Sequence, residues 1–220
     1  MGSSLKIIDL SYTIDEACMT CGTPWHAKVE LTHMGKINEV GRNTHGIRLG
    51  SHTGTHIDAP LHFFDEMEGI DTLDLSKVCG DCQVVDFSHI RAGEQVLLKD
   101  VENLLVTKRM LFKFNWFKQW QKECFYKDFP FFSLQAADYL VKKGLKVIAL
   151  DTPSPDSGKG IGEFDDSPVH KLFLKNGVTV IEYLTDTDRL NAGGVYTLIA
   201  LPLKLRDCDG APARVIMMEG

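Results

Sequence analysis

The sequence predicts an α/β (α+β) fold in which a mixed sheet is flanked by helices. Two observations lead to this prediction. Segments with the apolar pattern of strands alternate with segments that have the period of amphipathic helices. The composition is that of an ordinary globular protein, because 44% of the residues are hydrophobic and 25% are charged. No repeat and no Pro/Ser/Gly-rich linker divides the chain, so we expect residues 1–220 to form a single domain.

The predicted strands are short apolar or alternating runs that end near turn-forming residues. In chain order they are residues 6–10, 46–50, 84–87, 110–114, 145–150, 178–181, 195–205 and 214–218. Residues 11–43 are polar and contain several glycines without a clean period. We expect loops and short strands in that region.

Helix predictions rest on apolar residues at helical spacing and on start and stop signals. The predicted helices cover residues 99–108, 134–143 and 168–176. Ser133 is a good N-cap for the second helix, and Gly144 ends it. The third helix begins at Ser167-Pro168, an N-cap followed by a proline in the first helical position, and ends before Gly177.

The charge balance and hydropathy exclude several classes of protein. Thirty acidic residues oppose twenty-four basic ones, which gives a formal net charge of −6. An acidic chain does not attract nucleic acid through its overall field, so we predict no nucleic-acid partner. No run of about 18 apolar residues is present, so we predict no membrane span. The first residues lack the pattern of a secretory signal, and we expect a cytoplasmic enzyme or binding protein.

Two C-x-x-C pairs, Cys18/Cys21 and Cys79/Cys82, are present. Four thiolates bind zinc strongly, but these pairs lie much further apart in sequence than those of a zinc ribbon. We therefore predict reduced, independent thiols. A four-cysteine zinc site and a redox pair are the alternatives.

The strongest chemical signal lies between residues 52 and 62. Three of the eight histidines and one aspartate occur there, namely His52, His56, Asp58 and His62. Side chains an even number of positions apart on an extended segment share one face. Imidazole and carboxylate groups are the ligands that zinc, manganese and iron prefer. The spacing predicts a metal site, and a histidine-rich surface turn without a metal is the alternative.

The motif H-x-G-T-H-x-D-x-P-x-H-F, which begins at His52, resembles the signature of the metal-dependent cyclase/hydrolase family. This family includes bacterial kynurenine formamidase and isatin hydrolase. Residues 8–11 resemble its opening strand, and residues 201–204 and 209–214 resemble its C-terminal strands and the loop between them, so the resemblance covers most of the chain. It implies a swivelling β/β/α-type fold and a homo-oligomer, either a dimer or a tetramer.

The resemblance also implies roles for individual residues. Five positions match metal ligands of the family: His52, His56, Asp58, His170 and Glu182. They imply a divalent metal site that holds two ions bridged by Asp58. Zinc is the first choice for the metal, and manganese is the alternative. Without the resemblance, His170 would be interpreted as a surface histidine and Glu182 as a solvated acid at a strand end. His62 matches the catalytic acid/base, and the alternatives for it are a further ligand or a core histidine.

The implied activity is hydrolysis of a non-peptide C–N (amide) bond in a small-molecule substrate of aromatic character. Metal-bound hydroxide would attack the carbonyl while His62 exchanges the proton. Arylformamidase activity on N-formylkynurenine, or an isatin hydrolase-like reaction, is the leading prediction. Three alternatives stay open: a lactone hydrolase or cyclase on the same metals, a non-catalytic small-molecule or metal-binding protein, and an interaction module held by zinc at the C-x-x-C pairs.

One segment departs from the family pattern. Bacterial kynurenine formamidases carry a Met-Pro-x-Trp/Tyr-Pro-Gly-like segment near the N-terminus, and its aromatic residue packs on the substrate. Residues 18–24 match that segment here but lack its aromatic residue and both of its prolines. Trp25 and His26 follow closely and are candidates to replace them. The hydrolase prediction does not depend on this segment, whereas the kynurenine assignment does.

Aromatic residues crowd positions 112–132, with lysines between them. We expect most of these aromatic side chains to form core and a dimer interface. A hydrophobic lid over the metals is the alternative. A nucleic-acid-binding stripe would also combine aromatic and basic residues, but this stretch is short and the chain is acidic.

Overall fold

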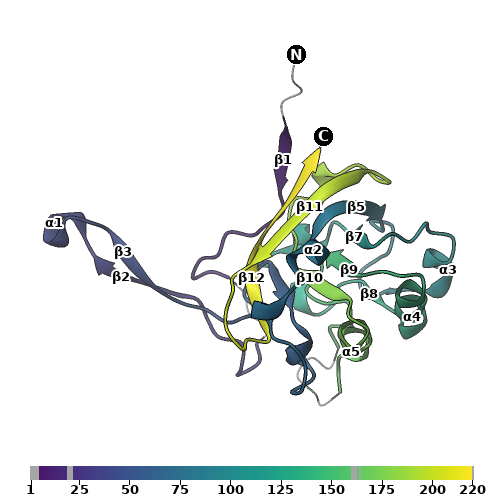
Figure 1. Cartoon of the computed structure of the whole chain (residues 1–220), viewed down its shortest axis with the longest axis horizontal. Helices are drawn as coiled ribbons and strands as arrows, with labels where there is room; N and C mark the ends of the chain where they lie inside the picture. Colours follow the sequence, from purple (N-terminus) through teal and green to yellow (C-terminus); the bar gives the residue numbers. More distant parts are fainter. Residues whose placement is uncertain (1–4, 19–21, 160–162, 164, 220) are drawn as a thin grey trace.

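A mixed sheet that closes into a barrel organises the structure. The computed structural model describes residues 5–18, 22–159, 163 and 165–219. The main sheet has eight strands in the order β1-β12-β11-β5-β7-β9-β10-β4. Strand β4 also pairs with β12, and this pairing closes the sheet (Figure 1). The consecutive pairs from β5 to β10 are parallel and the others are antiparallel, which confirms the predicted mixed α/β architecture.

The strands of the main sheet are β1 (Lys6–Asp9), β4 (His56–Asp58), β5 (Cys79–Asp86), β7 (Arg109–Lys113), β9 (Val147–Leu150), β10 (Thr179–Glu182), β11 (Val195–Pro202) and β12 (Gly210–Glu219). Two small sheets pair β2 (Glu30–Gly35) with β3 (Thr44–Arg48) and β6 (Gln95–Val96) with β8 (Phe131–Phe132). The α-helices are α1 (Ile37–Val40), α2 (Leu75–Val78), α3 (Leu98–Val101), α4 (Leu134–Lys142) and α5 (Pro168–Lys175). Short 3-10 turns cover Pro60–His62, Ile70–Thr72, Trp116–Gln119, Glu123–Tyr126 and Thr187–Arg189.

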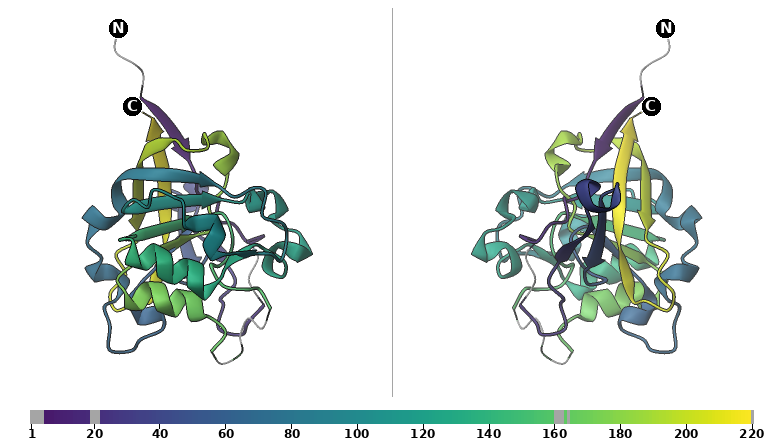
Figure 2. Two further views of the ribbon diagram at one scale, coloured as in Figure 1. Left: turned by 90° about the vertical axis from the view of Figure 1, so that its right-hand side faces the viewer. Right: turned by 90° about the vertical axis from the view of Figure 1, so that its left-hand side faces the viewer.

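Side-chain alternation along the strands separates two hydrophobic cores. In β9, Val147 and Ala149 pack inside the barrel with residues from β5, β11 and β12. Ile148 and Leu150 point the other way and pack with the apolar faces of α4 and α5. The helices accordingly lie against the outside of the barrel (Figure 2). Burial of both faces explains why β9 is a continuous apolar run rather than an alternating one.

The crowded aromatic stretch belongs to the outer core. Its fully or nearly fully buried members are Phe112, Phe114, Trp116, Phe125, Tyr126, Phe129 and Phe132. Tyr126 alone among these also lines a pocket of about 520 Å³. The stretch therefore supplies core packing, as predicted, and contributes one side chain to the candidate site.

Local sequence signals place some elements correctly and others only in part. The Ser133 side chain caps α4, because its oxygen accepts a hydrogen bond from the Ala136 backbone at 3.2 Å. The predicted helix 99–108 is wrong beyond its first turn, since α3 ends at Val101 and Leu105 is 79% exposed. The predicted strand 46–50 overlaps β3 but lies outside the main sheet.

An extended arm leaves the barrel between β1 and β4. It consists of β2, α1 and β3, and Figure 1 shows it projecting away from the body. Apolar side chains along it are exposed, including Met34 at 69%, Ile37 at 66% and Ile47 at 67%. A two-stranded sheet without a hydrophobic core is at best marginally stable in water. The arm therefore presents apolar surface that its own fold does not bury.

None of the helices within the described residues combines the length and the hydrophobicity needed to cross a bilayer.

Candidate functional site

The pairing of β4 with β10 places three of the predicted ligands on one face. The two strands are antiparallel, with His56 opposite Glu182 and Asp58 opposite Val180. Ile57 points into the barrel core, so the side chains of His56 and Asp58 point outward on the other face of β4. The shared face predicted for residues 56 and 58 is therefore observed.

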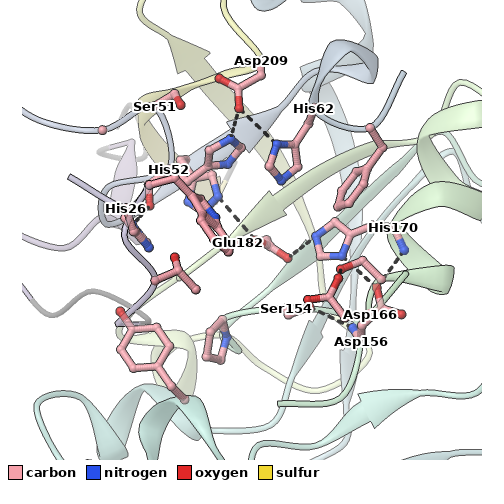
Figure 3. A pocket seen from close by; sticks show the side chains of 18 of the residues that line it. His26, Ser51, His52, His62, Ser154, Asp156, Asp166, His170, Glu182 and Asp209 are labelled. Carbon is pink, nitrogen blue, oxygen red and sulfur yellow. Dashed lines mark hydrogen bonds and ion pairs between the residues drawn. The ribbon is translucent and has the colours of Figure 1, made fainter. Parts of the chain in front are cut away.

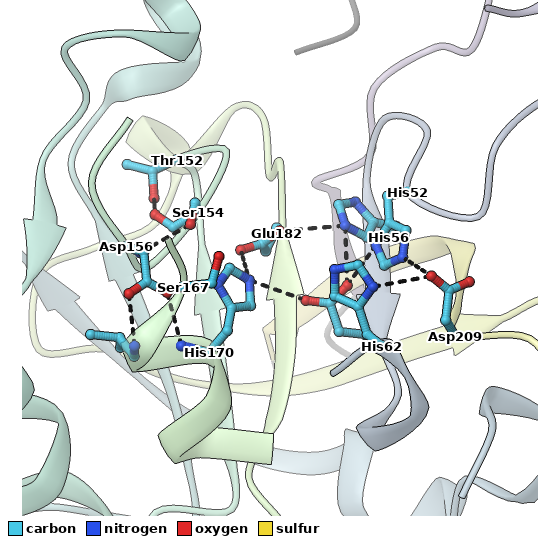
Figure 4. A network of polar contacts seen from close by, with 12 residues as sticks. His52, His56, His62, Thr152, Ser154, Asp156, Ser167, His170, Glu182 and Asp209 are labelled. Carbon is cyan, nitrogen blue, oxygen red and sulfur yellow. Dashed lines mark hydrogen bonds and ion pairs between the residues drawn. The ribbon is translucent and has the colours of Figure 1, made fainter. Parts of the chain in front are cut away.

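His52 and His170 approach these residues from two other segments. A turn at Gly54, which has a φ of +61°, brings His52 back beside β4, and its Nδ1 lies 2.9 Å from Asp58 Oδ1. His170 lies in the first turn of α5, with its Nε2 3.0 Å from Glu182 Oε1 and 3.4 Å from Asp58 Oδ2. The structure thus brings all five predicted ligands together, and Figure 4 shows four of them, His52, His56, His170 and Glu182. They form two groups that share Asp58, one with His52 and His56 and one with His170 and Glu182.

The donor set of these two groups suits divalent cations. Asp58 and Glu182 are only 2% and 3% exposed. Within the part of the chain that the structure describes, both oxygens of Asp58 and Oε1 of Glu182 make no hydrogen bond. Buried carboxylate oxygens that make no hydrogen bond are very costly, whereas imidazole nitrogens and carboxylate oxygens that converge within 4.8 Å are a typical metal-binding arrangement. The residues present therefore fit a divalent metal.

Electrostatics at the site point in the same direction. Burial opposes a charge on His56, but its contacts with Asp58 and Glu182 outweigh burial and raise its pKa to about 10. Burial likewise opposes ionisation of Asp58, yet the contacts with His170, His52 and His56 hold its pKa well below the usual range. The two carboxylates thus favour positive charge beside them, which protons on the imidazoles or a cation can supply.

His62 lies beside the two groups but in a different conformation from the one predicted. It ends the 3-10 turn Pro60–His62 instead of continuing an extended segment, because β4 ends at Asp58 and the turn starts at Pro60, after Ala59. Its Nδ1 is 3.0 Å from Asp209 Oδ2. Burial of the ring lowers the pKa of His62, which keeps it neutral near pH 7 and able to accept a proton.

A pocket of about 520 Å³ opens beside these side chains (Figure 3). Four aromatic side chains line it, namely Trp25, Phe63, Tyr126 and Tyr183. Its polar lining includes His62, His52 and Glu182, and among the described residues no lysine or arginine lines it. The pocket therefore suits a flat apolar group held next to a cluster of imidazoles and carboxylates.

Two acidic residues of the site, Asp156 and Asp209, were not predicted from the sequence. Asp156 lies in the loop after β9, and Asp209 directly precedes β12. Each contacts a predicted site histidine through one carboxylate oxygen. No local pattern marks either residue, because each meets its histidine only through the tertiary fold.

Asp156 performs the capping role that the sequence assigned to Ser167. Its Oδ1 accepts a hydrogen bond from the Val169 backbone at 2.7 Å, and its Oδ2 accepts one from the His170 backbone at 2.8 Å. The same Oδ2 lies 2.8 Å from His170 Nδ1. The Ser167 hydroxyl instead donates to Asp166. Asp156 therefore fixes both the start of α5 and the orientation of the His170 ring.

Replacing Asp156 with alanine should lower the free energy of unfolding by about 2–4 kcal/mol, because three buried charge-assisted hydrogen bonds disappear together. Urea denaturation followed by circular dichroism measures this change. Ser167→Ala is the matched control and should change stability by less than about 0.5 kcal/mol. Equal losses in the two variants would contradict the capping role of Asp156.

The cysteine pairs do not form a metal site among the described residues, since the candidate ligand groups found there contain no cysteine. Cys82 is fully buried, and burial raises the pKa of its thiol to about 12. A neutral thiol is a poor zinc ligand. Cys21 lies outside the described residues.

Comparisons with known proteins identify the family of the chain. The family model "Cyclase" matches residues 8–157. The kynurenine formamidase of Bacillus thuringiensis (strain Al Hakam) is 34% identical over 222 residues, with 96% of each chain covered. A structure described as a predicted metal-dependent hydrolase from Bacillus stearothermophilus is 28% identical, with a TM-score of 0.80 over 99% of this chain and 100% of that one.

An isatin hydrolase bound to the product analogue thioisatinate has the same fold, with a TM-score of 0.87 at 21% identity over 98% of this chain and 92% of that one. The family model covers more than half of the chain, and the formamidase match spans nearly all of it. The chain belongs to the cyclase family.

Proposed function

We propose that this protein is a metal-dependent hydrolase of non-peptide C–N bonds, and that its substrate is an aromatic amide such as N-formylkynurenine. The observation that carries the proposal is the pair of ligand groups sharing Asp58, whose carboxylate oxygens are buried and make no hydrogen bond within the described residues. Kynurenine formamidases that are similar over nearly the whole chain support the reaction class.

In this proposal the five clustered residues would hold two divalent ions, zinc as the first choice, and Asp58 would serve both ligand groups. Bound divalent ions supply Lewis acidity and make a water nucleophilic near neutral pH. Amide carbonyls are weak electrophiles, so this activation matters more for an amide than for an ester.

His62 moves the proton that amide hydrolysis requires. Asp209 contacts its Nδ1, and its Nε2 is the atom left for exchange with reactants in the pocket. The neutral imidazole accepts a proton from the attacking water and returns it to the departing nitrogen. The aromatic side chains of the pocket hold the ring of the substrate and exclude bulk water.

The direct test is release of formate from N-formylkynurenine by protein loaded with zinc or manganese, beside a chelated sample. We expect turnover only with metal. If that substrate is inert, a panel of isatin, other cyclic amides and lactones identifies the bond that is cleaved. Cleavage of a lactone but of no amide, or of no compound by a protein with a full complement of ions, would overturn the proposal.

Trp25 is the aromatic residue that we propose as a replacement for the missing one in residues 18–24. It is 71% exposed yet lines the pocket, and its neighbour His26 contacts the His52 backbone oxygen through Nε2 at 3.1 Å. That contact holds this segment of the chain beside the predicted ligands.

Replacing Trp25 with alanine should raise KM about 5- to 10-fold with a smaller effect on kcat, because an aromatic contact contributes about 1 kcal/mol. Steady-state kinetics on the substrate identified above measure both constants, and Trp25→Phe should keep most of the affinity. An unchanged KM in the alanine variant would show that Trp25 does not contact the substrate.

We also propose that the protein is a homo-oligomer, at least a dimer, assembled through the arm. The exposed apolar side chains of β2, α1 and β3 need a partner surface, and the arm carries both acidic and basic residues. Mixed charges suit contact with a second copy better than contact with a uniformly charged partner. Sedimentation velocity gives the oligomeric state directly, and a monomer at micromolar concentration would overturn this part of the proposal.

A further inference from the structure

One carboxylate oxygen connects a predicted metal ligand with the predicted acid/base. Oδ2 of Asp209 lies 2.8 Å from His52 Nε2 and 3.0 Å from His62 Nδ1. The two imidazole rings lie side by side, with centroids 4.0 Å apart. Figure 3 shows the carboxylate above both rings, at the edge of the pocket.

The fold fixes the position of this carboxylate. The Asp209 backbone oxygen accepts a hydrogen bond from Ala59 at 2.9 Å, and the next residue, Gly210, pairs with Asp58 across β12 and β4. A Cβ at Gly210 would lie 2.9 Å from His52 Cε1 and 2.9 Å from the Ile57 backbone oxygen. Only glycine permits so close an approach of the chain to the His52 ring. The hydrogen bond at the Asp209 backbone and the strand pairing of Gly210 therefore hold the Asp209 side chain against the two rings.

The chemistry of the contact determines which ring nitrogens carry protons. An ionised carboxylate only accepts hydrogen bonds, so Nε2 of His52 and Nδ1 of His62 must both donate. When the His52 ring is neutral, its Nδ1 then faces Asp58 with a lone pair, as a metal ligand requires, and Nε2 of His62 is left to exchange a proton in the pocket. A single side chain thus selects the tautomers of two residues with different tasks.

We propose that Asp209 is a positioning residue that holds His62 as the Nδ1–H tautomer and holds His52 ready to bind a metal ion through Nδ1. This inference rests on the proposed function for the role of His62, but its test does not depend on activity alone. This positioning role needs an acceptor oxygen beside His52 and His62. Asparagine at position 209 should therefore preserve part of the role, and alanine should preserve none of it.

The test compares wild type with Asp209→Ala and Asp209→Asn. Long-range ¹H–¹⁵N correlation spectra of ¹⁵N-histidine-labelled, chelated protein report the His62 tautomer. Steady-state kinetics and ion stoichiometry are measured on protein loaded with zinc. Asp65→Ala is the matched control, because Asp65 is exposed and lies just beyond the Pro60–His62 turn.

We expect Asp209→Ala to lose the fixed Nδ1–H tautomer of His62 and to lower kcat about 10- to 100-fold, with KM nearly unchanged. Asp209→Asn should recover part of both properties, and Asp65→Ala should match wild type. An unchanged His62 tautomer in Asp209→Ala would overturn the inference, as would an unchanged kcat. If wild type hydrolyses no substrate, the proposed function fails, and the tautomer and the ion stoichiometry still decide the role of Asp209.

Discussion

Replacing Asp58 with asparagine should abolish both ion binding and turnover. Asp58 is the residue that the two ligand groups share, and its two oxygens lie 2.9–3.4 Å from nitrogens of His52, His56 and His170. Asparagine keeps the volume of the side chain and removes its charge. We expect kcat/KM to fall by more than about 10³-fold, because several kcal/mol of transition-state stabilisation depend on the ions.

Ion content measured by mass spectrometry after dialysis gives the result independently of any substrate. Asp138→Asn is a suitable control, since Asp138 lies on the outer surface of α4, paired only with Lys142 in the salt bridges of the described residues. It should retain the ions and the activity of wild type. Full ion content in Asp58→Asn would show that the cluster has another purpose than metal binding.

Replacing His62 with alanine should have the opposite pattern, with turnover lost and ions retained. Removal of a general acid/base lowers kcat about 10²- to 10⁴-fold. None of the contacts between the five predicted ligands passes through His62, so these residues keep their arrangement in the variant. The ratio of kcat in variant and wild type, together with ion content, measures the two effects separately.

His89→Ala controls for the loss of a histidine, because His89 is exposed and contacts Phe87 away from the pocket. Loss of an ion from His62→Ala would instead make His62 a ligand, in the third potential group that it forms with His52 and Asp209. A variant that keeps most of its kcat would exclude His62 as the acid/base.

Local signals in the sequence were sufficient to predict the elements that are determined by interactions between neighbouring residues. The capping serine and the glycine stop bound α4, and the apolar run of β9 records burial on both faces. The alternation of residues 56 and 58 likewise appears in the structure, because β4 is a real strand. The position of His170 and Glu182 beside them was implied only by a family resemblance, since neither lies near β4 in sequence.

Other features depend on contacts that no local pattern encodes. Asp156, instead of the predicted Ser167, caps α5, because the loop that carries Asp156 folds back over the start of the helix. Asp209 reaches His52 across 157 positions of sequence. The predicted helix beyond Val101 does not form; Leu104 and Val106 pack against the outer core from a non-helical segment, and Leu105 is 79% exposed. Each of these outcomes is set by tertiary packing rather than by propensity.

The two ligand groups differ in how they couple to folding. His52, His56 and Asp58 are close in sequence, so a denatured chain keeps them near one another and retains some affinity for an ion. Ligand binding stabilises a protein only by the excess of its affinity for the folded state over the unfolded state. His170 and Glu182 meet Asp58 only after β4, α5 and β10 have assembled. An ion in that second group would therefore contribute more to thermal stability, because only the native chain brings the three residues together.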